Sequence, residues 1–128
     1  MVKSKLGAQG QQGFTLIEII AVLVILGILA VVAVPKYFNM QNDARKAAAQ
    51  GLVAAAQSQL SLGYANQKLN SSYGFNTYTS AALKAECDKV SISGNASLDC
   101  AASSNNGATI TGTVEGQTNT GNWNNPEG

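Results

Sequence analysis

Residues 14–34 read FTLIEIIAVLVILGILAVVAV, a run of 21 residues with one ionisable side chain, Glu18. As an α-helix this run would be about 31 Å long, which matches a bilayer hydrocarbon core of roughly 30 Å. The preceding residues 1–13 contain Lys3 and Lys5 and no acid, so the positive-inside rule keeps them in the cytoplasm. The sequence therefore predicts a membrane-spanning helix whose amino terminus lies inside and whose carboxyl end lies outside.

The composition of the whole chain excludes several classes of function. Its 128 residues allow one domain, and its eight Lys plus Arg against seven Asp plus Glu give a net charge of +1, too balanced for nucleic-acid binding. It has no histidine, the commonest general base and metal ligand. A P-loop, a metal-ligand cluster and a nucleophile–base pair are also not evident. We therefore expect no enzyme, no cofactor, no metal and no direct nucleic-acid binding.

Glu18 is costly in this position. A carboxylate in an apolar helix costs about 2.5 to 3.5 kcal/mol at the bilayer centre and less near an interface. Between Lys5 and Lys36 the chain has no basic side chain, so the charge needs a chain terminus or another molecule as its partner. A plain signal anchor is the simpler alternative, and Ala33 is a weak candidate for cleavage as a secretory signal.

The sequence Gly13-Phe14-Thr15-Leu16-Ile17-Glu18 resembles the type IV prepilin processing motif. The resemblance implies that a membrane prepilin peptidase and methyltransferase cuts after Gly13 and methylates Phe14, and that Glu18 recruits and registers subunits. It implies an inner-membrane precursor and an extracellular filament when mature. The implied partners are other copies of the chain in a helical homopolymer, the inner-membrane assembly machinery and minor pilins.

A physical mechanism exists for the role of Glu18. The freed ammonium of Phe14 can neutralise the Glu18 of an adjacent subunit, with an attraction of roughly 4 kcal/mol at about 4 Å and an effective dielectric near 20. Desolvation offsets much of this, so we expect the pair to contribute register more than stability.

Pro35 lacks the amide hydrogen that a continuous helix needs, so a kink is expected near it. Beyond it, residues 35–65 predict an amphipathic helix whose apolar stripe contains Tyr37, Met40, Ala44, Ala48, Gly51, Leu52, Ala55, Gln59 and Leu62. The resemblance implies that the helix loosens between Gly27 and Pro35 in assembled filaments. Gly27 could also simply be tolerated, or allow close helix packing.

Residues 66–128 are rich in Asn, Ser, Thr and Gly and predict a small antiparallel β head, so the fold class is α+β. Alternation predicts strands at 89–93 and 108–114, with turns at 94–95 and 105–107, and the segment after Gly116 reads as a partly mobile tail. The aromatic side chains are expected to form the core of this head.

Cys87 and Cys100 lie on the exported side and are expected to form one disulfide. A loop of about 14 residues closed in this way stabilises a small domain by roughly 3 kcal/mol. Glu86, Asp88 and Asp99 flank the pair; a calcium site is conceivable, but solvated loop acids interleaved with lysines are favoured.

The leading hypothesis is the major subunit of a type IV pilus that serves adhesion, biofilm formation or motility. Residues 35–45 and 50–52 resemble the mannose-sensitive haemagglutinin type of major pilin. The alternatives are a type II secretion pseudopilin, which shares the amino-terminal segment, and a membrane-anchored enzyme or binding module.

Overall fold

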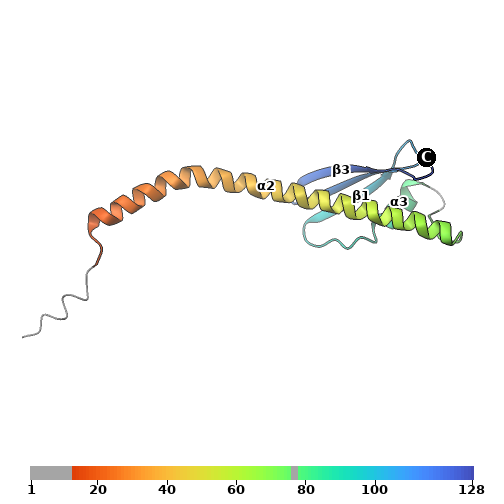
Figure 1. Ribbon diagram of the computed structural model, residues 1–128, viewed down its shortest axis with the longest axis horizontal. Coiled ribbons are helices and arrows are strands. Elements are labelled where there is room, and N and C mark those ends of the chain that lie inside the picture. Colours follow the sequence, from red (N-terminus) through yellow and green to blue (C-terminus); the bar gives the residue numbers. More distant parts are fainter. Residues whose placement is uncertain (1–12, 76–77) are drawn as a thin grey trace, which may run out of the picture. The chain divides into compact units, whose positions relative to one another are not determined.

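The computed structural model describes residues 13–75 and 78–128, so the predicted leader lies outside the described residues except for Gly13. The chain has one long helix followed by a short helix and a three-stranded sheet (Figure 1), which confirms the predicted α+β class. The elements are α2 (Leu16–Leu69), α3 (Ser80–Cys87), β1 (Ala96–Ala102), β2 (Ala108–Val114) and β3 (Gln117–Trp123).

The chain divides into two compact units, residues 1–39 and residues 40–128. In the first unit the described residues are 13–39, and all of them are exposed. From Leu16 onward they form the start of α2. Helical structure runs through Pro35 without interruption; the kink itself stays a prediction. At its other end α2 reaches Leu69, four residues beyond the predicted end.

The second unit contains an antiparallel sheet in the order β1-β2-β3. The β2–β3 connection has only Glu115 and Gly116 between paired residues, both with positive φ (47° and 85°), as a tight two-residue hairpin turn requires. Arg45 of α2 forms a solvent-exposed ion pair with this turn, with its Nε 2.7 Å from Glu115 Oε2, and such pairs contribute little to stability. The turn predicted at 105–107 is confirmed as the β1–β2 connection.

The core of the second unit lies between the later part of α2, α3 and the sheet. It includes two of the predicted aromatic side chains, Phe75 and Trp123, while Tyr64, Tyr73 and Tyr78 pack against it. The Phe75 and Trp123 ring centroids lie 6.0 Å apart. Its other buried members are Val53, Ala56, Leu60, Leu83, Cys87, Leu98, Cys100, Ala108 and Ile110.

Two glycines bring the sheet close to α2. A Cβ at Gly112 of β2 would lie 2.8 Å from the carbonyl oxygen of Ala49, and a Cβ at Gly121 of β3 would clash with Val53 Cγ1. Gly112 pairs with Asn119 and Gly121 pairs with Ile110, so the two glycines lie diagonally on adjacent strands, two pair positions apart. Together they form a smooth surface against which α2 can lie.

Two local predictions for the head are wrong, and one element was missed. Residues 89–93 are irregular and connect α3 to β1, which lies further on, at Ala96–Ala102. The predicted tail contains β3, and α3 was not predicted. β1 and β3 contain no valine or isoleucine, so their structure depends on pairing with β2 and on packing rather than on propensity.

The predicted apolar stripe is not the face of α2 that packs against the sheet. Its members are exposed except for Leu52 and Gln59, which are partly buried. The exposed stripe, as we define it, consists of Ala44, Ala48, Gly51, Ala55 and Leu62. The buried stripe consists of Ala49, Val53, Ala56, Leu60 and Gly63. Both stripes have helical spacing, so periodicity alone did not select the one that faces the sheet.

Candidate functional site

The predicted processing site lies at the start of α2. Gly13, Phe14 and Thr15 precede the helix, and Phe14 is 85% exposed. Thr15 N donates to Glu18 Oε2 at 2.8 Å, and Glu18 N donates to Thr15 Oγ1 at 3.3 Å. This reciprocal pair is a capping box, which satisfies amide groups that a helix start otherwise leaves without partners. Helical structure therefore begins after the Gly13–Phe14 bond.

Sequence reasoning missed this capping role. The signal was present, since threonine followed three residues later by glutamate before an apolar run is typical of a helix start. The structure gives Glu18 a hydrogen-bond donor within its own chain, the Thr15 amide. An amide does not neutralise a charge, so the need for a cationic partner stands.

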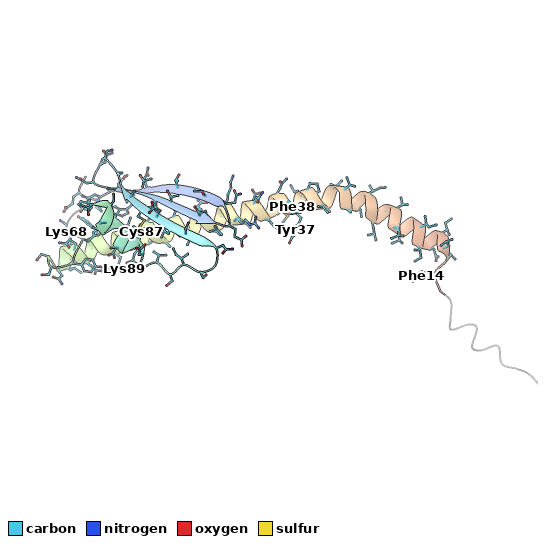
Figure 2. The ribbon with its side chains drawn as sticks, turned by 180° about the vertical axis from the view of Figure 1, so that it is seen from behind. Phe14, Tyr37, Phe38, Lys68, Cys87 and Lys89 are labelled. Atoms are coloured by element: carbon cyan, nitrogen blue, oxygen red, sulfur yellow. A yellow bond between two sulfur atoms is a disulfide. The ribbon has the colours of Figure 1, made fainter. Side chains whose placement is uncertain are left out.

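No side chain within residues 13–75 and 78–128 covers the apolar segment that follows. α2 contains an 18-residue window of mean hydropathy 3.1, none of which is buried. Its side chains project from the ribbon between Phe14 and Tyr37 (Figure 2). Gly27 lies in this helix, and a Cβ there would meet nothing within 4 Å. By length and composition the helix can cross a membrane.

Cys87 and Cys100 form a disulfide with an S–S distance of 2.01 Å. Cys87 ends α3 and Cys100 lies in β1, so the bond joins these two elements. Both residues are almost completely buried. Burial in the core is typical of a structural disulfide, whereas reactive cysteines are accessible.

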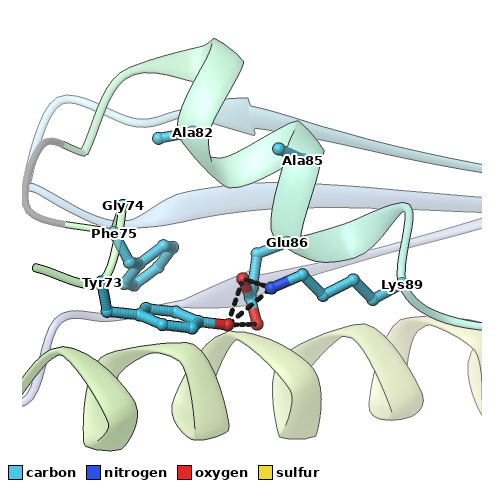
Figure 3. Close-up of a pocket in the computed structure, with 7 residues that line it drawn as sticks. All are labelled: Tyr73, Gly74, Phe75, Ala82, Ala85, Glu86 and Lys89. Atoms are coloured by element: carbon cyan, nitrogen blue, oxygen red, sulfur yellow. Dashed lines mark hydrogen bonds and ion pairs between the residues drawn. The ribbon is translucent and has the colours of Figure 1, made fainter. Parts of the chain in front are cut away.

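Glu86 of α3 is the most deeply buried charged side chain among the described residues, at 4% exposure. Lys89 Nζ lies 2.6 Å from Glu86 Oε2, and the Tyr73 hydroxyl lies 3.2 Å from both oxygens (Figure 3). Gln59 Nε2 of α2 donates to Glu86 Oε1 at 2.8 Å. The prediction of a solvated loop acid is therefore wrong for Glu86.

This network attaches α3 to α2. Gly63 of α2 lies against the Glu86 side chain, and a Cβ there would be 2.8 Å from Glu86 Cδ. The hydrogen bond from Lys89 to Glu86, and then that to Tyr73, raises the pKa of Lys89. Because a buried carboxylate needs a charged partner and full hydrogen bonding, the network fixes where α3 lies on α2.

The other flanking acids do not gather around Glu86. Asp99 pairs with Lys84, with 3.3 Å between Oδ1 and Nζ. Within residues 13–75 and 78–128, no group of three or more His, Cys, Asp or Glu side chains is placed to hold a metal ion.

Comparison with protein families finds the prokaryotic N-terminal methylation motif at residues 9–34. Neither a curated protein nor a solved structure matches the chain. The motif supports a type IV pilin-like or pseudopilin protein, which is made as a membrane-anchored precursor and processed by a prepilin peptidase.

Proposed function

We propose that this chain is the major structural subunit of a type IV pilus filament. The observation that carries the proposal is that the apolar start of α2 is completely exposed, while residues 40–128 have a core of their own. Soluble monomers rarely expose so large a continuous apolar surface. Lipid covers this surface in the precursor, and neighbouring copies cover it in the filament.

Cleavage after Gly13 starts the assembly pathway. No described residue requires glycine here, because a Cβ at Gly13 would meet nothing within 4 Å. We expect the limit on side-chain size and charge at position 13 to come from the peptidase. Gly13→Ala should retain much processing, whereas a bulky or charged residue at this position should block it. The same enzyme methylates the new terminus at Phe14.

The Glu18 carboxylate then binds two groups, one in its own chain and one in a neighbouring copy. One carboxylate oxygen accepts the hydrogen bond from the Thr15 amide of its own chain. A carboxylate has two oxygens with several acceptor sites, so it can bind the Phe14 ammonium of a neighbouring copy without giving up the cap. This arrangement sets the register of one subunit on the next.

The second unit also supports polymer formation. The exposed stripe places small side chains and Leu62 on a face of α2 that the head does not cover. Small residues allow close approach of helices. We assign this stripe to contacts with neighbouring copies in the filament shaft, while the disulfide-joined head forms its outer surface.

The chain acts as a structural protein and not as an enzyme. Its partners are other copies, the prepilin peptidase, the inner-membrane assembly machinery and minor pilins, and its use is surface adhesion, biofilm formation or motility. A secretion pseudopilin shares the amino-terminal motif. The disulfide between α3 and β1 favours the pilus subunit, and of this class the mannose-sensitive haemagglutinin type is the one proposed.

Intact-mass and amino-terminal analysis of sheared surface material from native cells tests the proposal. The expected result is a polymer whose subunits begin at methylated Phe14. A chain that still begins at Met1, or that is cut near Ala33, would overturn it.

A second experiment tests the pairing of Glu18. We expect Glu18→Ala to permit membrane insertion and cleavage but to reduce sheared filaments strongly, because the Phe14 ammonium loses its counter-charge. Glu115→Ala is the matched control, since it removes an exposed acid of the head. Normal filaments from the Glu18→Ala chain would contradict the pairing.

A further inference from the structure

We infer that Lys36, Tyr37 and Phe38 form an interface belt that contacts phospholipid headgroups at the outer face of the inner membrane. The inference rests on the membrane-anchored precursor of the proposed function and adds the depth at which that precursor sits. It concerns the chain before assembly.

The two aromatic side chains of the belt have no packing role in the fold. Tyr37 is 61% and Phe38 58% exposed, and the first fully buried residue of α2 is Ala49. Their rings contact each other edge to face, with centroids 6.4 Å apart. Figure 2 labels both side chains on α2.

The position of the belt matches a membrane boundary. Residues 14–34 span about 31 Å as a helix, so Lys36 begins where a hydrocarbon core of roughly 30 Å ends. Tyrosine is enriched at such boundaries because its ring is apolar and its hydroxyl is polar. Phe38 extends the apolar surface into the same layer.

Charge selects phospholipid as the occupant. The ion pairs among the described residues use Arg45, Lys68, Lys84 and Lys89, and none of them uses Lys36. Lysine at the end of a spanning helix extends its ammonium towards the phosphate layer while its methylene stem lies along apolar surface. A second copy that covered the belt would need an acid opposite Lys36.

The belt would fix the depth of the processing site. Glu18 lies 18 residues before Lys36, which is about 27 Å along a helix. With Lys36 at the outer headgroups, Glu18 and the Gly13–Phe14 bond lie at the inner boundary. There the Glu18 carboxylate is less costly than at the bilayer centre, and the bond is presented to the cytoplasmic side of the membrane.

Depth-dependent fluorescence quenching tests the belt. The full chain is placed in vesicles of phosphatidylcholine and phosphatidylglycerol that carry bromine either near the headgroup or near the end of the acyl chain. The variants are Phe38→Trp at the belt and Val24→Trp in the middle of the span. Native Trp123 is 5% exposed in the head core, so the unchanged protein supplies the unquenched background.

We expect bromine near the headgroup to quench Phe38→Trp more strongly, and bromine near the chain end to quench Val24→Trp more strongly. Quenching of Val24→Trp without any at Phe38→Trp would overturn the belt and leave the proposed function standing, with the aromatic pair reserved for contact between copies. Deep quenching of Phe38→Trp would also overturn it. An unquenched Val24→Trp would overturn both, because the chain would not span the bilayer.

Processing gives a second readout. Replacing Lys36, Tyr37 and Phe38 by alanine should slow cleavage after Gly13, since the site is no longer held at one depth. The control is Lys46→Ala, which removes an exposed charge further along α2. Cleavage at the unchanged rate in the triple variant would show that the belt does not set the depth.

Discussion

The buried stripe and the exposed stripe lie on the same stretch of α2 and differ in what covers them. Leu60 of the buried stripe is fully buried, while Leu62 of the exposed stripe is 54% exposed. Both stripes combine alanines and one glycine with larger aliphatic residues, which are Val53 and Leu60 in the buried stripe and Leu62 in the exposed stripe. The comparison teaches that helical spacing identifies faces that can pack, whereas the opposing surface decides which of them does.

The opposing surface here is the glycine-containing part of the sheet. Gly112 and Gly121 allow α2 to approach until Ala49 and Val53 contact the strands. Gly51 of the exposed stripe has nothing within 4 Å of its Cβ position. The buried stripe therefore stabilises the subunit, and the exposed stripe is free to contribute to contacts between subunits.

The largest expected difference is between two leucines. Leu60→Ala should lower the free energy of unfolding by about 2 to 5 kcal/mol, because it removes a fully buried side chain and leaves a cavity. Leu62→Ala should change it by less than about 0.5 kcal/mol. Denaturant unfolding of the full chain in detergent, followed by Trp123 fluorescence, measures both. Equal losses would show that the two stripes do not differ in the isolated subunit.

The variants Leu60→Ala and Leu62→Ala also compare the two stripes in cells, through the yield of filaments. Leu62→Ala should reduce the yield of sheared filaments although the subunit remains folded and is cleaved. If its filaments are normal and those of Leu60→Ala are the only ones lost, the exposed stripe has no part in assembly.

An intermediate difference is expected between two glycines. Gly121→Ala should destabilise the head by about 1 to 3 kcal/mol, because the new methyl group has no room against Val53. Gly51→Ala should instead stabilise the subunit by up to about 1 kcal/mol, since alanine favours helix and the site is open. Thermal unfolding of the two variants compares them. A stabilised Gly121→Ala chain would refute the close contact between sheet and helix.

The smallest expected effect is the pH dependence at the end of α2. Hydrogen bonds from Lys68 and then Tyr64 lower the pKa of Glu127 from 4.5, and the bond to Glu127 raises the pKa of Lys68 from 10.5. A lowered acid pKa contributes stability above pH 4.5 that is lost as the pH falls through the folded value. The raised lysine pKa contributes stability below pH 10.5 that is lost as the pH rises.

Because this pair is exposed to solvent, the change in melting temperature should be small. Glu127→Gln should remove the acid-side and alkaline-side contributions of the pair together, whereas Glu115→Gln, which alters the Arg45 pair instead, should leave them. A pH profile identical in the Glu127→Gln chain and the unchanged chain would show that packing alone holds the carboxyl-terminal segment near Lys68 and Tyr64.

Much of the amino-terminal region could be predicted because its signals are local. Apolar length, a lone carboxylate and the residues around Gly13 are properties of consecutive positions, and even the missed capping box at Thr15 and Glu18 could be read from spacing. The head was harder. β1 and β3 carry few aliphatic residues, so pairing with β2 and contact with α2 define them, and both depend on residues distant in sequence.

Glu86 shows the same limit at a single residue. Lys84, Asp88 and Lys89 lie close to it in sequence, which favoured an exposed acid. Its burial follows from Gln59, Gly63 and Tyr73, which arrive from other parts of the chain. The local sequence pattern around Glu86 does not show which distant residues contact it in the folded chain.

The sequence by itself determined that α2 begins as a membrane-length apolar helix with an acid near its start, because bilayer thickness and helix rise act on consecutive residues. It also determined the α+β class. Only the tertiary structure decided which stripe of α2 is buried, where the strands lie and how Glu86 is held. These outcomes depend on shape complementarity between distant segments, and Gly112, Gly121 and Gly63 supply that complementarity by lacking a side chain.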